Sequence, residues 1–330
     1  MEFWLPVFFV SAMGLALLIY VILDGYDLGV GLLLPFADDD EKDTMIASIG
    51  PFWDANETWI VLGVGILLIA FPHAHGIILT SLYLPVTAML MGLILRGVAF
   101  DFRVKAGAEK KSMWNQLFFI GSLIASMSQG WMLGAYITGL ESNTVSLIFS
   151  ALIALTLPAL YIMLGSSWLM MKTKDQLFNK AVNWARRAIF PMGFALLLVS
   201  VATPVVSSEI ADKWFTLPNS ISLLPIPLIC LIYFAAIVWV LNSDRILQAG
   251  YGWLVFISLI VICLMATIGL AFSIFPDIII GKMDIWQAAS STDSLRFTFI
   301  GTAITLPAII GYTIFIYKVF HGKATNLTYE

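Results

Sequence analysis

Charge is scarce in this chain of 330 residues. Asp, Glu, Lys and Arg together make up 12% of it, whereas hydrophobic residues make up 60%. About a quarter of the residues in a soluble domain are charged, so this composition excludes a soluble globular protein. We therefore expect an integral membrane protein whose functional residues lie in the membrane or close to it.

Cysteine and histidine are also scarce. Both cysteines, Cys230 and Cys263, lie within apolar stretches, where a thiol usually packs as a small apolar group, so no disulfide framework is expected. Of the 3 histidines, His73 and His75 are expected in a short loop after the second helix, and His321 lies near the C-terminal end. Haem iron in membrane bundles generally needs inward His or Met side chains, so we expect no haem and no metal in this chain.

Signatures of nucleotide and nucleic-acid binding are missing too. The net charge is −4, and the chain has neither a basic cluster nor a glycine-rich phosphate loop, so no nucleic-acid partner is expected. The acidic stretch 38–43 is most simply a solvated connector. Residues 1–23 lack a basic segment and a cleavage site, which predicts a retained helix rather than a removed signal peptide.

Long apolar stretches dominate the chain instead. A membrane-spanning helix needs about 17–25 mostly apolar residues. The sequence therefore predicts an all-α integral membrane protein with nine transmembrane helices in a single transmembrane domain. The predicted helices cover about residues 5–27, 55–72, 76–95, 116–140, 145–171, 187–206, 222–241, 252–275 and 297–319.

The distribution of basic residues predicts the orientation. Lys and Arg are retained on the cytoplasmic side of a membrane, whereas Asp and Glu contribute little to this rule. All but three of the 17 Lys and Arg fall on one side of the nine predicted helices; the exceptions are Lys213, Lys282 and Arg296. The N-terminus is therefore expected outside and the C-terminus in the cytoplasm.

The first helix carries two carboxylates, Asp24 and Asp27, one turn apart near its far end. A charged side chain at the bilayer centre costs roughly 2.5–3.5 kcal/mol on insertion scales, and such groups usually face a protein interior or a water path. The pair therefore indicates proton handling. The alternative is a helix that overshoots the membrane and leaves both carboxylates in the wet interface.

A second polar cluster lies where the second helix begins, in the stretch 50–59. Asp54 as the N-cap with Glu57 at position N3 has the spacing of a capping box, which would account for both residues without chemistry. The same stretch also contains Asn56, Thr58 and two tryptophans, more polarity than capping requires. The sequence leaves two alternatives for Asp54, a functional role and a role as N-cap.

A third cluster lies at the cytoplasmic end of the third helix. Asp101 and Lys105 are four residues apart, so they can pair on one helical face. Arg96 and Arg103 are expected to extend to the membrane surface while their stems stay in lipid. With Asp27 and Asp54, three helices could contribute carboxylates to one polar region on the side from which protons are taken up.

These motifs resemble those of a known family, subunit II of cytochrome bd-type quinol oxidases. The resemblance runs along the chain in order and spacing, and implies two four-helix bundles plus one peripheral helix. It also implies a haem-bearing subunit I with two b-type haems, one d-type or third b-type haem and an outer quinol site. The matching blocks are Asp24–Gly31, Gly50–Trp59, Leu95–Arg103 and Trp286–Ser291.

The same resemblance implies roles for a few residues. Asp54 and Asp101 would line a cytoplasmic proton path towards the haems of subunit I, with Lys105 in its opening region. Asp27 matches the second Asp of the family's first motif, and the resemblance assigns no role to Glu57. For relay, Asp54 and Asp101 need pKa values nearer to the working pH than that of a free Asp, which burial would favour.

Two tryptophans are candidates for the boundary with subunit I or lipid. Trp59, and with it Trp53, would line that boundary. The alternative for Trp59 is an aromatic anchor at the membrane interface.

The resemblance implies a subunit of an electrogenic, non-pumping oxidase in a bacterial inner membrane. Quinol would be oxidised outside, and protons for oxygen reduction would come from the cytoplasm. Partners would include subunit I, lipid and small single-helix accessory subunits. Two other functions stay open: a proton-coupled transporter, although no internal repeat is evident, and a purely structural membrane partner.

Overall fold

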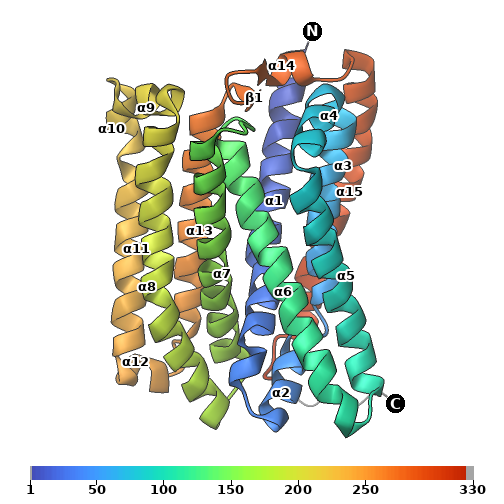
Figure 1. The fold of residues 1–330 in the computed structure, drawn as a ribbon, viewed down its shortest axis with the longest axis vertical. Coiled ribbons are helices and arrows are strands. Elements are labelled where there is room, and N and C mark those ends of the chain that lie inside the picture. Colours follow the sequence, from blue (N-terminus) through green and yellow to red (C-terminus); the bar gives the residue numbers. More distant parts are fainter. Residues whose placement is uncertain (1, 325–330) are drawn as a thin grey trace.

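The computed structural model describes residues 2–324 as long helices that run side by side (Figure 1). Within these residues, nine helices are long and apolar enough to cross a membrane, which confirms the predicted number. They are α1 (Trp4–Leu33), α3 (Trp53–Ala70), α5 (Tyr83–Lys105), α6 (Ala108–Ile137), α7 (Thr144–Lys172), α8 (Asp175–Val206), α11 (Pro225–Asn242), α13 (Trp253–Ile274) and α15 (Thr292–Val319).

Short elements close the two ends of the molecule. We call the end at which α1, α5, α7 and α15 finish the basic end; it is the lower end in Figure 1 and the one predicted to be cytoplasmic. It holds η1 (Leu34–Phe36), α2 (Asp39–Ile49) and α12 (Asp244–Gln248). The opposite end holds α4 (Pro72–Ser81), α9 (Ser208–Phe215), α10 (Asn219–Leu223), the antiparallel strands β1 (Asp277–Ile279) and β2 (Met283–Asp284), and α14 (Ile285–Ala288).

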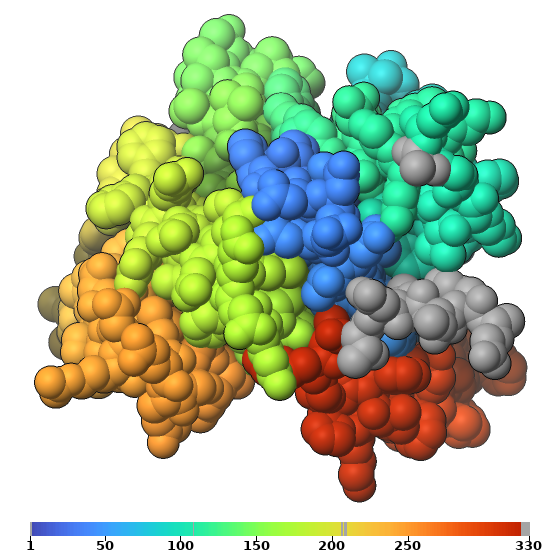
Figure 2. All heavy atoms as spheres, turned by 90° about the horizontal axis from the view of Figure 1, so that it is seen from below, coloured from blue at the N-terminus to red at the C-terminus, as the bar shows by residue number. Residues whose placement is uncertain are grey.

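Helix α1 lies at the centre of the molecule and packs against α3, α6, α7, α13 and α15. Seen from the basic end, the segment of α1 and α2 is surrounded by the ends of the other helices (Figure 2). Glycine permits the closest contact, because a Cβ atom on Gly29 would lie 1.8 Å from the carbonyl oxygen of Tyr161 on α7. Residues of α1 near the basic end are therefore enclosed by protein rather than lipid.

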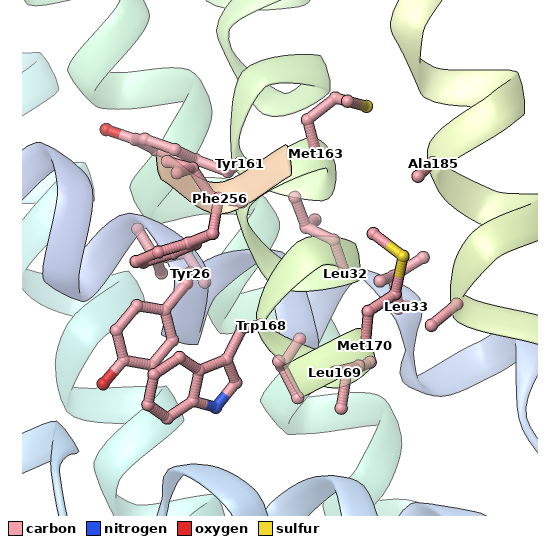
Figure 3. Packing of buried hydrophobic residues seen from close by; sticks show 14 of the residues in the cluster. Tyr26, Leu32, Leu33, Tyr161, Met163, Trp168, Leu169, Met170, Ala185 and Phe256 are labelled. Carbon is pink, nitrogen blue, oxygen red and sulfur yellow. The ribbon is translucent and has the colours of Figure 1, made fainter. Parts of the chain in front are cut away.

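Aromatic rings fill the core around this part of α1 (Figure 3). Tyr26 stacks on Trp168 of α7 with ring centroids 4.0 Å apart, and Phe256 of α13 meets both rings at 6.1 Å. Aromatic side chains each bury a large apolar area, and such ring pairs add about 0.5–1.5 kcal/mol beyond it. The core thus holds the acidic part of α1 in a fixed position.

Several predicted helix bounds are wrong by half a turn to three turns. The third helix was expected at 76–95, but α5 runs from Tyr83 to Lys105, and the start of that stretch belongs to α4. Helix α4 also contains His73 and His75, which were expected in a loop. The sixth was expected at 187–206, but α8 begins at Asp175. In both cases the helix extends beyond the apolar stretch into a charged segment. Ion pairs there satisfy charged side chains such as Arg103 and Lys180.

The acidic stretch 38–43 is not merely a connector. Asp38 and Glu41 form a capping box, in which the backbone N–H of Asp38 donates to Glu41 Oε2 at 2.8 Å, and α2 follows. Acidic residues in a first turn complement the positive end of a helix, so the local charge pattern favours this structure.

Candidate functional site

The acidic residues singled out above all lie towards the basic end, but the structure divides them into two sets. We call Asp24, Asp27, Asn56, Glu57 and Arg96 the buried group, and Asp54, Asp101 and Lys105 the surface group. Asp24, Asp27 and Asn56 are fully buried, whereas every member of the surface group is exposed in the isolated chain.

Arg96 is the centre of the buried group and only 2% exposed. Its Nη2 atom lies 2.7 Å from Asp24 Oδ1 on α1 and also pairs with Glu57 on α3. The prediction that Arg96 extends to the membrane surface is therefore wrong, because two carboxylates hold its charge inside the bundle. One guanidinium links α1, α3 and α5.

Arg103 is buried for a similar reason, so the same prediction is wrong for this residue. Its Nη2 donates to Asp43 Oδ1 of α2 at 2.5 Å, and its Nε donates to Asn115 of α6. Lys111 Nζ reaches the other oxygen of Asp43 at 2.7 Å. Burial alone would raise the pKa of Asp43, but the hydrogen bonds and charges of Lys111 and Arg103 outweigh burial and lower it.

Asp27 is held by an amide rather than by a cation. Asn56 Nδ2 donates to Asp27 Oδ2 and also contacts the hydroxyl of Tyr26, both at 2.8 Å. On the other side, Tyr317 of α15 donates to Asn56 Oδ1 at 3.1 Å. Asn56 thus joins α1 to α15, and its polarity within an apolar helix has a structural reason.

A second polar contact lies further inside, one turn before Asp24 along α1. Gln129 Nε2 of α6 donates to the hydroxyl of Tyr20 at 2.8 Å, and Tyr161 of α7 donates to the side-chain oxygen of Gln129. The buried polar region therefore extends from the basic end towards the middle of the helices.

The surface group has no comparable partners. Helix α3 begins at Trp53 with Phe52 as its N-cap and without a side-chain cap, so Asp54 is not the predicted capping residue. Asp101 and Lys105 form no ion pair in the described part of the chain. Both side chains, Asp54 and Asp101, are exposed in the isolated chain, which therefore does not supply the burial that would favour relay.

Two aromatic side chains lie against the buried group. The rings of Trp53 and Phe100 lie 5.3 Å apart, next in sequence to Asp54 and Asp101. Both rings line a hollow that has no room for a water molecule; the other lining residues are Asp27, Ile49, Arg96, Gly97 and Phe118. Asp54 and Asp101 are therefore each one residue along the chain from a side chain that borders the buried group.

The two tryptophans of α3 have different surroundings. Trp59 is 1% exposed and packs with Ala16 and Tyr20, so it lies inside the chain and lines neither the subunit boundary nor the membrane interface as predicted. It is enclosed because α1 crosses α3 at this point. Trp53 is half-buried, and its place at a subunit boundary stays a prediction.

Sequence reasoning did not bring four residues of the site together. Glu57 and Arg96 pair between α3 and α5, and the signal was an acidic residue in the second predicted helix and a basic residue just past the end of the third. Asn56 stands out in the sequence only as excess polarity. No sequence signal indicated that Tyr317 would reach it, because 261 positions separate the two residues.

The histidines of the described residues lie at the two ends of the molecule. His73 and His75 lie on α4 at the opposite end, whereas His321 follows α15 at the basic end, so no two facing helices bring histidines together. Among residues 2–324, no group of three or more His, Cys, Asp or Glu side chains is arranged to hold a metal ion. Cys230 and Cys263 are both free.

Comparison with known proteins gives consistent results along the chain. Residues 5–320 match the family model described as cytochrome bd terminal oxidase subunit II. The chain is 28% identical to cytochrome bd ubiquinol oxidase subunit 2 of Bacillus subtilis (strain 168), with 93% of each chain covered. It is 25% identical to cytochrome bd-I ubiquinol oxidase subunit 2 of Escherichia coli (strain K12), covering 95% of this chain and 93% of that protein.

The fold is also similar to that of a solved structure. A chain in the structure of bd oxidase from Geobacillus thermodenitrificans superposes with a TM-score of 0.77 at 18% identity. The match covers 96% of this chain and 98% of that one, so the arrangement of helices is shared along nearly the whole length.

Proposed function

Because the chain belongs to the family of cytochrome bd terminal oxidase subunit II, and so to an oxidoreductase complex, we propose that it lines a cytoplasmic proton path and stabilises subunit I. Its place would be a bacterial inner membrane. Quinol would give up electrons and protons at the outer side of subunit I, and oxygen reduction would consume protons from the cytoplasm. Each charge separated across 100 mV stores about 2.3 kcal/mol.

The haems of this complex, two b-type and one d-type or third b-type, would all belong to subunit I. The positions of His73, His75 and His321 at opposite ends support this division. The contribution of this chain is therefore to bind the partner, exclude lipid and position ionisable groups. Small single-helix accessory subunits and lipid would complete the assembly.

The observation that carries the proton path is that neither Asp54 nor Asp101 has an ion-pair partner among residues 2–324. Both side chains are exposed in the isolated chain, and the two residues directly follow Trp53 and Phe100 in the sequence. A carboxylate without a fixed cation can change its protonation without breaking an ion pair, as a relay requires. A partner chain over this surface would take both groups out of bulk water, and Lys105 would lie at the opening.

A purely structural role is the competing function, and the buried group favours it for that region. Arg96 joins three helices through Asp24 and Glu57, which is the arrangement expected of a packing element. Such a role does not extend to the surface group, whose side chains hold no elements together. The two functions therefore apply to different residues of the chain.

Replacement of Asp54 by Asn in the assembled oxidase tests the proposal. The change removes the ionisable group and disturbs no cap, because Asp54 is not the N-cap of α3. We expect normal haem content and oxygen consumption lower by about tenfold or more, since general acid–base groups contribute roughly 10²–10⁴-fold. Asp40→Asn, at an exposed acidic residue of α2, is the matched control. Full activity in Asp54→Asn would contradict the proton path.

A further inference from the structure

The buried group has an excess of negative charge. It contains three carboxyl groups, Asp24, Asp27 and Glu57, and a single cation, Arg96; no other Lys or Arg of residues 2–324 lies within 4.0 Å of them. With every carboxyl group ionised, the group would hold two more negative charges than positive ones in an interior of low dielectric constant. Burial of uncompensated charge is strongly unfavourable, so the group needs a bound proton or cation.

Unpartnered atoms gather in the same place. Among the described residues, both oxygens of Asp24, Oδ1 of Asp27 and Nη1 of Arg96 are buried without a hydrogen-bond partner. Asp24 Oδ1 lies 2.7 Å from Arg96 without the geometry of a hydrogen bond. Buried polar groups in native proteins are nearly always satisfied. Three of these four atoms are carboxyl oxygens, which a bound proton would help to satisfy.

The position of Asp27 distinguishes it from the other two carboxyl groups. Asp24 and Glu57 both pair with Arg96, whose positive charge offsets part of theirs. Among the described residues Asp27 makes no ion pair, and it accepts one hydrogen bond, from Asn56, while lining the hollow behind Trp53. A proton on Asp27 would therefore halve the excess, from two negative charges to one.

Protons can exchange between the buried group and the solvent at the basic end by one evident route. Glu57 is the only acidic member of the buried group with an exposed part, at 28% of its side chain. It pairs with Arg96 and lies one turn from Asp54 on α3. Other titratable side chains near the group, from α1, α7 and α15, are Tyr20, Tyr26, Tyr161 and Tyr317.

We propose that the buried group is a proton-binding site, with its proton on Asp27 and exchange with the basic end past Glu57. It is separate from the surface group and would buffer protons beside the path formed by Asp54 and Asp101. This inference rests on the proposed function for its purpose.

Infrared difference spectroscopy of the purified oxidase complex tests this site. A protonated carboxyl group absorbs apart from a carboxylate, and its band shifts when the complex is transferred from H₂O to D₂O. We expect such an exchangeable band in the parent and its loss in Asp27→Asn. Asp54→Asn is the control and should retain the band. A band of full intensity in Asp27→Asn would overturn the proposal.

Two milder variants keep the test decisive where Asp27→Asn does not assemble. Asp27→Glu retains the carboxyl group and should shift the band rather than remove it. Tyr317→Phe removes the hydroxyl that donates to Asn56 and should shift it through the hydrogen bond to Asp27. An unchanged band in every variant that assembles would overturn the site. Full turnover in Asp54→Asn with an altered band in Asp27→Glu would instead refute the path and leave the site standing.

Discussion

The surface group and the buried group lie at one end of the same bundle, yet their carboxylates differ in what surrounds them. Asp24 and Glu57 meet the guanidinium of Arg96, whereas Asp54 and Asp101 have no cationic partner among the described residues. A paired carboxylate stabilises the packing of helices and resists protonation. An unpaired one is available for proton transfer. The role of these acidic residues thus depends on whether a cation pairs with them, and not on their position along the helix.

The largest effect should follow from breaking the buried ion pairs. Arg96→Gln leaves Asp24 and Glu57 without a cation in the interior, and removal of one partner of a buried pair typically costs about 3–5 kcal/mol. We expect little assembled oxidase at the growth temperature and a much lower thermal midpoint for what remains.

A matched control for this variant is available on the same helix. Lys105→Gln removes one positive charge from an exposed position of α5 and should change stability by less than about 0.5 kcal/mol. Equal losses of assembly in both variants would erase the distinction between the two groups. Yield after affinity purification and thermal unfolding of the complex measure both effects.

The next effect concerns turnover rather than assembly. If Asp54 and Asp101 serve one path, Asp101→Asn should lower oxygen consumption by about tenfold or more, as Asp54→Asn does. The double variant should then be no slower than the slower single variant, because residues that act as a unit are not additive. Losses that multiply in the double variant would indicate two independent roles.

A smaller effect is expected at Asp43, which supports buried Arg103 from a partly exposed position. Asp43→Asn should lower stability by about 1 kcal/mol, towards the upper end for exposed ion pairs. Because the pKa of Asp43 is lowered in the folded chain, its contribution to stability is complete above the ordinary Asp pKa of about 3.9. This contribution is lost as the pH falls below that value. Thermal midpoints of parent and variant should therefore converge in acid. A gap that persists below about pH 3 would contradict this assignment.

Much of the fold could be predicted from the sequence, because a bilayer imposes one strong condition on length and hydropathy. Nine apolar stretches gave nine helices, and an odd number places the two termini at opposite ends. The bounds of α5 could not be predicted in this way. On a hydropathy scale Arg96 is unfavourable in a membrane-spanning helix. In the structure, ion pairs with Asp24 and Glu57 from two other helices offset this free-energy cost.

The site was predictable in its residue types but not in its geometry. The spacing of Asp24 and Asp27 correctly indicated carboxylates on one helix that face the protein interior. Asp54 and Glu57 had the spacing of a capping box, but α3 begins at Trp53, and Glu57 turns to Arg96 instead. Contacts between distant segments, such as Asn56 with Tyr317, follow from helix packing and leave no local pattern.

The proposed proton path requires that the surface group faces subunit I. The most direct measurement is an experimental structure of the assembled oxidase, compared with the exposure of the same side chains in the isolated chain. We predict that subunit I covers Asp54 and Asp101, while Asp24 stays paired with Arg96 and Asp27 stays bonded to Asn56. Asp54 and Asp101 facing only lipid or bulk water, with no atom of subunit I in contact, would contradict the account.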